Sequence, residues 1–462
     1  MSQSSEWTQV SDGLWQRPMG ENERFLRFIG DRSHAIGREH WSVTATAIFQ
    51  LKAPDVGEKD IDLKKALREA WKLLRFRHPS VASSATSDSN LQYVVPRTAE
   101  DLEDWLAQSY FVVQESDVDA DVLVSRLQPK PIATLHYLAS QSQIVLHTAH
   151  WRTDAYGAFH LVEALFAGLA HILDTGSFHK ELAWGDEVGR LVPSVEFALR
   201  LPDHASSDIV DAARQYLATG RHLHGTAGLQ CRSNGTTKPE GTRHAHLSIP
   251  EEITTKLEAT CQDVGIDLYS ATHAAVAKLN YTRTAAEDQH KHYTSTIRLN
   301  LRPHLHAPYN TPLTASGVYT GGYMFRTEPN QSLVEIARQL QSQYSGEPSD
   351  EFILSRRQYA QMVLDVVKSG AGPPPPTSNM DVSFIRGVDN IVRSQWDTKY
   401  GTLIIENLGL GVETLSMQAY CVYWKFNGRL TLSIWFNDAH YDISDMAKLL
   451  EELRDILVAE FS

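Results

Sequence analysis

The sequence has few cysteines. Only three occur in 462 residues, and Cys231, Cys261 and Cys421 stand far apart. Structural zinc sites and redox-active dithiols usually place two cysteines two residues apart, and this chain has no CxxC spacing. The sequence therefore excludes a cysteine-rich zinc module and a dithiol enzyme, and it indicates a protein of the reducing cytoplasm.

Positive charge is also scarce. The chain carries 43 Lys and Arg against 56 Asp and Glu, which gives a formal net charge of -13 at pH 7. It has no block of basic residues that could neutralise a row of phosphates. Nucleic acid and anionic membrane surfaces are therefore excluded as partners.

Long apolar runs are missing as well. The opening residues MSQSSEWTQVSDGLWQRPMG lack the apolar core of a signal peptide, and no later stretch approaches the roughly 20 apolar residues of a membrane span. We therefore expect no membrane span and no secretion, and a cytoplasmic location.

Several signatures of catalysis are absent. The chain has no GxSxG nucleophile elbow, no GxxxxGK phosphate loop and no HExxH zinc motif, and Gly409-Leu410-Gly411 lacks the rest of a dinucleotide fingerprint. These absences argue against hydrolase, nucleotide-binding and zinc-protease functions. We expect neither a bound metal nor a bound cofactor.

What is present is the pattern of a folded α/β protein, with 42% hydrophobic and 21% charged residues. Helical periodicity is clearest in residues 60–74, 157–173, 251–264, 268–279, 333–344 and 443–458. Strand patterns lie between them, at residues 133–138 paired with 143–150, at 243–249, at 293–301, and in a hairpin over 420–436 that turns at Asn427-Gly428.

Two breaks organise the chain. GTAGLQCRSNGTTKPEGT, residues 225–242, is typical of a long connection, and GAGPPPP, residues 370–376, excludes helix and central strand. A chain of this length suffices for two domains of roughly 200 residues each. We therefore predict two mixed α/β halves, residues 1–222 and 243–462, joined by a crossover connection at 223–242.

The stretch HTAHWRTDAYG, residues 147–157, follows the apolar run Ile144, Val145, Leu146. Alternation along a strand puts His150 at the end of the apolar stripe, where one edge of its ring packs and one nitrogen can meet a ligand. Asp154 falls in the turn before an amphipathic helix. From the residues alone, His150 is either a catalytic base or a structural histidine of the core.

The HxxxD spacing is not specific in a chain with 20 histidines and 56 acidic residues. It occurs a second time, from His204 to Asp208, in a polar loop where Ser206, Ser207 or Asp208 is expected to cap a helix. The first case differs because a buried strand leads into it and a helix leads out. His147 lies on the other face of that strand, which favours a place in the core.

HTAHWRTDAYG resembles the HxxxDG motif of the chloramphenicol acetyltransferase-like superfamily, which includes BAHD-type plant acyltransferases, fungal O-acetyltransferases and peptide-synthetase condensation domains. Fungal enzymes of the trichothecene 15-O-acetyltransferase type are the most similar, chiefly through HTAHWRTD. Further segments resemble the superfamily in the same order, so that the likeness covers most of the chain: LLRFRHPSV (73–81), GIDLYSATHAAVAKL (265–279), TIRLNLRPHL (296–305), GVYTGGYMF (317–325) and WKFNGRLTLSIWFNDAHYD (424–442).

This resemblance implies an α/β fold of two chloramphenicol acetyltransferase-like mixed-sheet domains that share a central tunnel. It further implies an O-acyltransferase of secondary metabolism that uses acyl-CoA, most simply acetyl-CoA, as co-substrate and a small hydrophobic alcohol as acceptor. His150 would be the general base, since an imidazole titrates near neutral pH. Asp154 would orient the structure by pairing with Arg302 or, as second choice, Arg298.

The remaining candidates concern the tunnel and the oxyanion. Tyr319, Gly321 and Gly322 are candidates to line the tunnel, because glycines let backbone approach a ligand closely; an ordinary turn is the alternative. Asn379 and Ser383, after the proline loop, are candidates to stabilise the oxyanion.

Two departures from the family pattern leave alternatives open. Ala155 replaces the glycine that usually follows the aspartate, and the DFGWG motif of the plant branch is absent. Two alternatives therefore remain. One is a condensation or cyclisation catalyst that takes substrates from a carrier protein, and the other is a relative that binds or isomerises a metabolite without acyl transfer. We expect a monomer.

Overall fold

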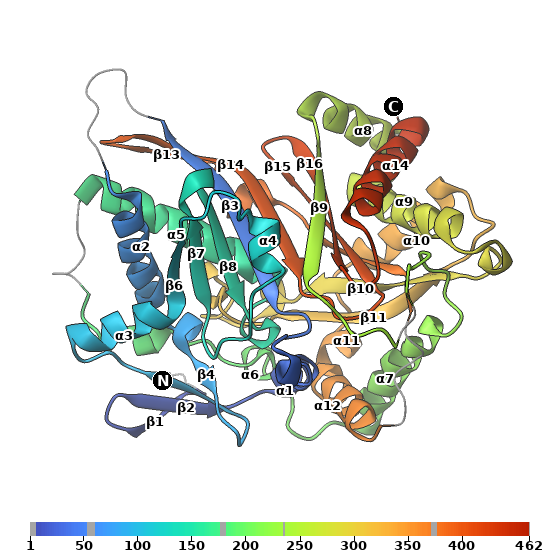
Figure 1. Cartoon of the computed structure of the whole chain (residues 1–462). Helices are drawn as coiled ribbons and strands as arrows, with labels where there is room; N and C mark the ends of the chain where they lie inside the picture. Colours follow the sequence, from blue (N-terminus) through green and yellow to red (C-terminus); the bar gives the residue numbers. More distant parts are fainter. Residues whose placement is uncertain (1–5, 53–60, 176–181, 234–235, 371–376, 462) are drawn as a thin grey trace.

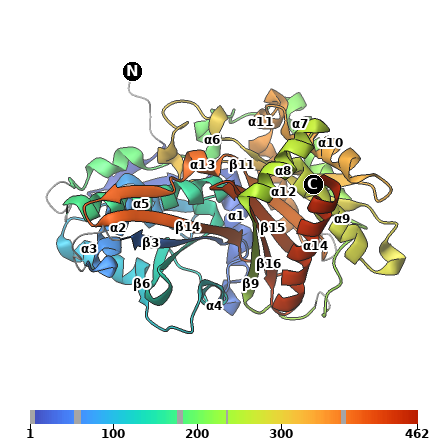
Figure 2. The ribbon, with the colours of Figure 1, turned by 90° about the horizontal axis from the view of Figure 1, so that it is seen from above.

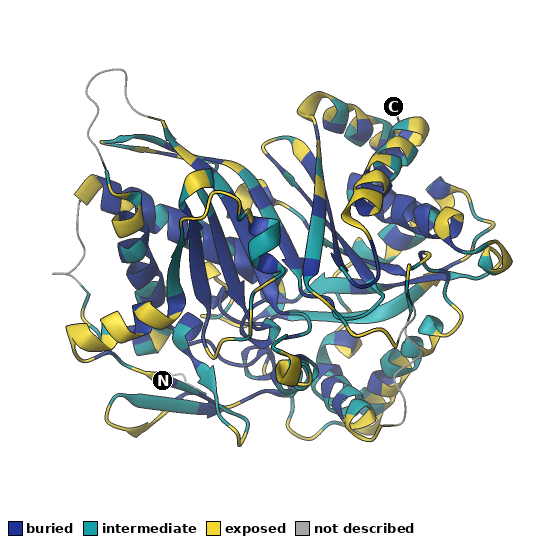
Figure 3. Cartoon of the chain, in the orientation of Figure 1, coloured by how far each residue is buried: buried dark blue, intermediate teal, exposed yellow. Residues whose placement is uncertain are grey.

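The computed structural model describes residues 6–52, 61–175, 182–233, 236–370 and 377–461. It has two halves side by side, each with a mixed sheet covered by helices (Figure 1). Large side chains with less than 2% exposure, among them Trp71 and Trp424, lie in these halves. Figure 3 shows the sheet interiors buried and the outer faces of many helices exposed.

The sheet of the first half has the strand order β13-β14-β3-β8-β7-β6. The pair β6-β7 is parallel, and the other neighbours are antiparallel. Its strands are β3 (Val43–Lys52), β6 (Tyr110–Val113), β7 (Thr134–Leu138), β8 (Gln143–Thr148), β13 (Gln395–Thr398) and β14 (Gly401–Val412).

The sheet of the second half has the order β12-β15-β16-β9, and two smaller sheets accompany the large ones. The second-half strands are β9 (Thr242–Ile249), β12 (Met380–Ile385), β15 (Ala419–Phe426) and β16 (Arg429–Asn437). The small sheets are β1-β2-β5-β4 and β10-β11, with β1 (Thr8–Ser11), β2 (Leu14–Pro18), β4 (Ser84–Ala85), β5 (Asn90–Val94), β10 (Tyr293–Asn300) and β11 (Thr320–Thr327).

The helices are numbered in their order along the chain. Residues 1–222 form α1 (Glu21–Asp31), α2 (Leu63–Arg77), α3 (Ala99–Ser109), α4 (Ala120–Val124), α5 (Ala155–Thr175), α6 (Val195–Ala198) and α7 (Ser207–Ala218), of which α7 lies beside helices of the second half (Figure 1). Residues 243–462 form α8 (Glu251–Asp263), α9 (Leu268–Arg283), α10 (Leu333–Tyr344), α11 (Asp350–Leu354), α12 (Arg356–Lys368), α13 (Val388–Ile391) and α14 (Ile443–Phe461).

The elements expected from periodicity are confirmed to within a few residues. The predicted helices correspond to α2, α5, α8, α9, α10 and α14, and the predicted strands to β7, β8, β9, β10, β15 and β16. Asn427 and Gly428 both have positive φ, 49° and 72°, as the tight turn between β15 and β16 requires. Residue 60 of the first predicted helix and residues 371–376 of the proline segment lie outside the described residues.

Helix α5 corrects the expectation that no stretch approaches the length of a membrane span. It has 21 residues, and its most apolar window has a mean hydropathy of 1.4, enough by length and composition alone to cross a bilayer. However, 67% of that window is buried inside the protein, where α5 packs on α2 and β3. Its apolar character is therefore explained by the core of the first half.

Strand β14 crosses the predicted division between the halves. By sequence it belongs to residues 243–462, yet it pairs along the whole of β3, from Thr402 opposite Lys52 to Val412 opposite Val43. Figure 2 shows it extending from the second half over the first. The predicted boundaries thus divide the chain but not the sheets, because the second half completes the sheet of the first.

Candidate active site

His150 lies where the buried strand β8 ends. Ile144, Val145 and Leu146 of this strand are fully buried, and β3 and β7 pair on either side. The chain leaves the sheet after Thr148, and His150 begins a short 3-10 turn that ends at Arg152. The predicted strand therefore ends two residues early, and His150 is positioned by the turn that follows the strand and not by alternation along it.

His150 is half-buried, and its Nδ1 atom is buried without a hydrogen-bond partner of good geometry in the described part of the chain. Burial lowers the pKa of His150 below its ordinary value of 6.5, and the positive charge of Arg298 acts in the same direction. Backbone hydrogen bonding and the Asp154 carboxylate act against this decrease. The ring is therefore neutral at pH 7 and able to accept a proton.

Asp154 is 1% exposed and bridges the two halves. Nη1 of Arg302 donates to both of its carboxylate oxygens, at 2.6 and 2.8 Å. The backbone amides of Gly157 and Tyr319 donate to the same carboxylate, at 2.9 and 2.7 Å. The expected ion pair with Arg302 is present, and none of these hydrogen bonds goes to the His150 ring.

Gly157, the first glycine after Asp154, lies in close contact with the second half. A Cβ atom at residue 157 would collide with the carbonyl oxygen of Ala315 and the hydroxyl of Thr153, and would lie 2.8 Å from Nη2 of Arg302. The close approach of the second half therefore requires glycine here. At Ala155, where the family motif has glycine, the side chain is only partly buried.

Arg298, the second choice as partner of Asp154, pairs elsewhere. Its Nη2 donates to Asp381 at 2.7 Å, and its Nη1 donates to the carbonyl of Val382. The Thr296 hydroxyl donates to the same carboxylate at 2.9 Å. Asp381 follows the proline segment on β12, and no sequence pattern had indicated that it would meet β10.

The three expected tunnel residues occupy different surroundings. Tyr319 is fully buried and donates its hydroxyl hydrogen to the carbonyl of Pro193 at 2.8 Å, so its side chain joins the halves and does not face open space. Gly321 and Gly322 are partly exposed, and they lie within strand β11 opposite β10, which corrects the alternative of an ordinary turn.

The two oxyanion candidates also differ. Asn379 is fully buried, and its amide is already engaged, donating to the carbonyl of Thr294 at 2.8 Å and accepting from Gln418 at 3.3 Å. It is therefore poorly placed to serve as an oxyanion donor. Ser383 is partly buried on β12, two residues after Asp381, and it remains a candidate.

The other histidines behave as expected of structural residues. His147 is 6% exposed, its Nδ1 lies 2.9 Å from the Thr44 hydroxyl, and burial lowers its pKa to about 3. His204 is exposed in a loop, and Ser206 is the N-cap residue of α7, which follows it. The second HxxxD segment is thus the start of a surface helix.

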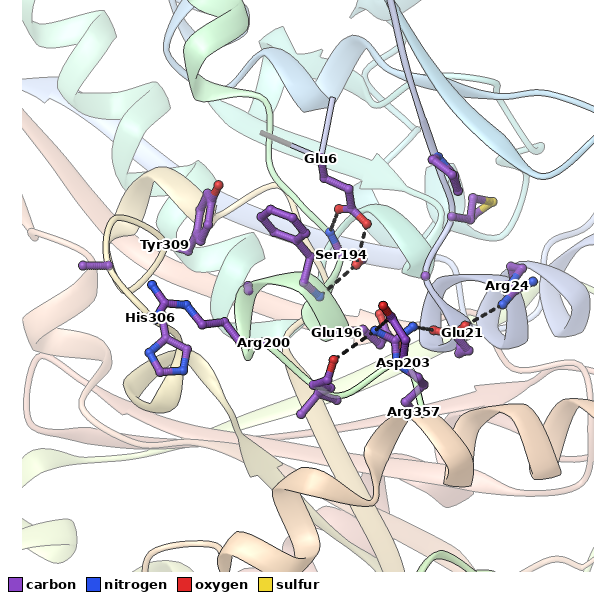
Figure 4. Close-up of a pocket in the computed structure, with 17 residues that line it drawn as sticks. Glu6, Glu21, Arg24, Ser194, Glu196, Arg200, Asp203, His306, Tyr309 and Arg357 are labelled. Atoms are coloured by element: carbon purple, nitrogen blue, oxygen red, sulfur yellow. Dashed lines mark hydrogen bonds and ion pairs between the residues drawn. The ribbon is translucent and has the colours of Figure 1, made fainter. Parts of the chain in front are cut away.

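Among the cavities in the described part of the chain, two are well defined, and His150 lines neither of them. One, of about 620 Å³, is bordered by charged side chains such as Glu21, Arg24 and Arg357, which are joined in ion pairs (Figure 4). The other, of about 660 Å³, is bordered by Tyr269, Tyr344 and Arg386 of the second half. The central tunnel with His150 at its middle stays a prediction.

Within the described part of the chain, one group of side chains has the spacing of metal ligands. Asp31, His34 and Glu39 bring their ligand atoms within 4.8 Å of one another. Asp31 is already paired with Arg27 at 3.0 Å, and the His34 side chain is 43% exposed. Only Glu39 of the three is buried, and the arrangement is also explained by ion pairing, so we assign no metal to it.

Comparison with known proteins now bears on the family. Acetyltransferase pigO of the fungus Monascus ruber is 41% identical over 457 residues, which cover 98% of this chain and 98% of pigO. The chain belongs to this acetyltransferase family. O-acetyltransferase pigM of the same fungus is 26% identical over 458 residues, covering 99% of this chain and 87% of pigM. No family model matches the chain.

The fold of this acetyltransferase is that of the chloramphenicol acetyltransferase-like superfamily. The structure of trichothecene 15-O-acetyltransferase TRI3 from Fusarium sporotrichioides superposes with a TM-score of 0.80 at 15% identity, covering 99% of this chain and 98% of TRI3. The resemblance seen in the sequence is confirmed in fold and in family, and the protein is an acyltransferase.

Proposed function

We propose that this acyltransferase moves an acetyl group from acetyl-CoA to a hydroxyl of a hydrophobic secondary metabolite, with His150 as general base. The observation that carries the proposal is the neutral, half-buried His150, which follows the end of β8. It stands beside the ion pair of Asp154 with Arg302 that joins the two halves, here called the Asp154 clamp. The names of the fungal relatives support acetyl as the transferred group.

The reaction needs one proton carrier. Nε2 of His150 accepts the proton of the acceptor hydroxyl while that oxygen attacks the thioester carbonyl, forming a C–O bond and a tetrahedral oxyanion. The oxyanion collapses with cleavage of the C–S bond, and the imidazolium returns its proton to the departing CoA thiolate. No covalent acyl-enzyme is required.

Asp154 acts on geometry in this scheme. Its carboxylate is fully occupied by Arg302 and by two backbone amides, so it holds the first turn of α5 against the second half. That turn begins five residues after His150. Asp154 is therefore a positioning residue for the base, and the reaction does not use it as a proton relay.

The apolar strand leading to His150 and the net charge of -13 favour a neutral, hydrophobic alcohol over an anionic acceptor. We further propose that the protein works as a cytoplasmic monomer. Secondary metabolism is proposed because a trichothecene acetyltransferase shares the fold.

The test uses purified protein, acetyl-CoA and a panel of hydrophobic alcohols, with release of free CoA thiol measured by a colorimetric reagent. Thiol release that depends on the alcohol and yields the acetyl ester supports the proposal. If no acyl-CoA releases thiol and only an acyl group on a carrier protein is transferred, then acyl-CoA is not the donor. The carrier-dependent alternative then replaces the proposal.

A further inference from the structure

The cavity of about 660 Å³ in the second half has an aromatic wall. It lies between the ends of α8 and α10 and the start of α9, and Tyr269 and Tyr344 line it. Phe384 packs on both rings, with centroids 5.3 Å from Tyr269 and 4.7 Å from Tyr344. The Arg386 guanidinium lies 4.7 Å over the Tyr269 ring and 5.0 Å over the Phe384 ring. Two tyrosine rings and a cation therefore border the cavity, and Phe384 contacts both rings at interplanar angles of 41° and 70°.

This aromatic cavity adjoins the candidate active site. The backbone amide of Arg386 donates to the Tyr156 hydroxyl at 3.2 Å, and Tyr156 stands in the first turn of α5, two residues after Asp154. On its inner side, Tyr344 is close enough to Arg298 and Asp381 for both charges to act on its pKa. Arg298 in turn acts on His150. The hydrogen bond to Tyr156 therefore links one edge of the cavity to the helix turn that follows Asp154, and the charge of Arg298 acts on both Tyr344 and His150.

The charges of the aromatic cavity do not suit a polyanion. Arg386 is the one cation among its described lining residues, and Asp267 already pairs with it at 3.0 Å. Glu258 lines the same cavity and binds Lys425 at 2.7 Å. A CoA molecule with its phosphates would find no unpaired cation here, whereas a neutral ring would find aromatic faces to stack on.

We propose that the aromatic cavity is the entrance and holding site of the acceptor, and that this acceptor carries its hydroxyl on a flat, conjugated ring system. The ring packs against the side chains of Tyr269 and Arg386, and the hydroxyl points past Tyr344 toward His150. The assignment rests on the proposed function, because it names the substrate class of that reaction. It places the polyanionic donor on a different side of the base.

A pair of probes with the same skeleton tests the assignment. 2-Naphthylmethanol is flat and conjugated, whereas decahydronaphthalene-2-methanol is saturated, and the binding of each is measured by titration calorimetry without acetyl-CoA. We expect the wild type to bind the flat probe about tenfold more tightly, as stacking and cation contacts allow. Equal affinity for the two probes would overturn the proposal.

Two variants locate the binding site, with one control. Tyr269→Leu should abolish the preference for the flat probe, and Arg386→Gln, at a side chain that is 39% exposed, should reduce it even if Tyr269→Leu fails to fold. Tyr309→Leu, in the other cavity, should keep the preference. Retention of the preference in both cavity variants, or displacement of the probe by CoA, would contradict the assignment.

The experiments distinguish an error in the proposed binding site from an error in the proposed reaction. If the probe binds in the aromatic cavity but no alcohol is acetylated, the reaction is wrong and the site stands. If acetylation occurs while Tyr269→Leu and Arg386→Gln leave the KM for the flat alcohol unchanged, the site is wrong and the reaction stands. When both are right, these variants raise the KM for the alcohol and leave the KM for acetyl-CoA unchanged.

Discussion

His150 and Asp154, four residues apart, are held by different interactions. The Asp154 carboxylate is saturated by Arg302, Gly157 and Tyr319, whereas Nδ1 of His150 is buried without a hydrogen-bond partner of good geometry among the described residues. A triad would require the aspartate to accept a hydrogen bond from the imidazole. In the described structure the Asp154 carboxylate accepts hydrogen bonds from Arg302 and two backbone amides instead. Substitutions of His150 and of Asp154 should therefore have different effects.

Replacing His150 should remove activity and leave the fold intact. In His150→Gln we expect kcat/KM for acetyl transfer to fall about 100-fold to 10,000-fold, because general base catalysis contributes about that much. The midpoint of thermal unfolding should change little, since His150 is half-buried and its Nδ1 has no hydrogen-bond partner with good geometry within the described structure. Thiol release and calorimetry measure the two effects.

The control for this substitution is His204→Gln, in the second HxxxD segment, where the histidine is exposed. It should leave kcat/KM unchanged. The pH profile adds a check, because the base acts when neutral and burial lowers the pKa of His150. Activity should therefore reach half its plateau below pH 6.5, and a midpoint above that value would be inconsistent with the described site.

Among the helices and strands, the first turn of α5 is the place where loss of one ion pair should most clearly destabilise the fold. Asp154→Ala should lower the free energy of unfolding by about 3 to 5 kcal/mol, because it leaves Arg302 buried without its partner. It also removes the acceptor for two backbone amides. Denaturant unfolding monitored by circular dichroism measures this loss.

Asp208→Ala is the matched control, since this exposed aspartate stands in the first turn of α7. Its effect on unfolding should stay within about 1 kcal/mol. If Asp154→Ala were as stable as the wild type and merely inactive, the carboxylate would have a chemical role that the clamp does not explain.

Gly157 should tolerate no side chain. In Gly157→Ala the added methyl group meets the Ala315 carbonyl, so we expect a loss of about 1 to 3 kcal/mol in unfolding free energy despite alanine's better helix propensity. Gly220→Ala provides the comparison, because nothing lies within 4 Å of the place that its methyl group would take. Equal stability of the two variants would show that the halves are less closely packed at α5 than the Gly157 contacts require.

Prediction from the sequence succeeded where the information is local. Helix α5, the β7-β8 pair and the Asn427-Gly428 turn follow from periodicity and turn chemistry, and the family motif supplied the pairing of Asp154 with Arg302. It failed where contacts are distant. The pairing of Arg298 with Asp381 and the burial of Asn379 depend on how β12 meets β10, which no spacing along the chain encodes.

At the scale of the whole molecule, strand β14 ties the halves together. It adds to β3 from far along the chain, as the register of Thr402 opposite Lys52 shows. The Asp154 clamp and the Thr153 hydroxyl, which donates to the Ala315 carbonyl at 2.8 Å, join the halves again beside the base. Because several links cross between the halves, we expect them to unfold in one transition.

Buried titratable groups predict how this stability depends on pH. Burial lowers the pKa of six histidines to about 3 or 4, namely His40, His78, His136, His147, His160 and His273. The unfolded chain binds protons at these groups below pH 6.5 and the folded protein does not, so they destabilise the fold as the pH falls. Burial also raises the pKa of three carboxyls to about 7, namely Glu39, Glu196 and Glu413, which stabilises the fold over the same range.

Between pH 6.5 and 4.5 the three carboxyls offset only part of the effect of the six histidines. Below pH 4.5 the unfolded chain also protonates its carboxyls, so this offset ends, while each histidine whose folded-state pKa lies below the ambient pH still contributes about 1.4 kcal/mol per pH unit. We therefore expect the unfolding free energy to fall as the pH drops below 6.5 and to fall more steeply just below pH 4.5. Urea titrations across this range measure it, and an unfolding free energy that stays constant from pH 6.5 to 4.5 would contradict the burial of the histidines.

The central claim is acetyl transfer with His150 as base, and one measurement tests it most directly. Metabolites of the host are compared by liquid chromatography and mass spectrometry in strains that carry the wild-type protein or His150→Gln at equal abundance. We predict that the variant strain loses a product and accumulates a precursor lighter by one acetyl unit. A product that persists in the variant strain, or two compounds of equal mass, would contradict the account and favour an isomerising or binding role.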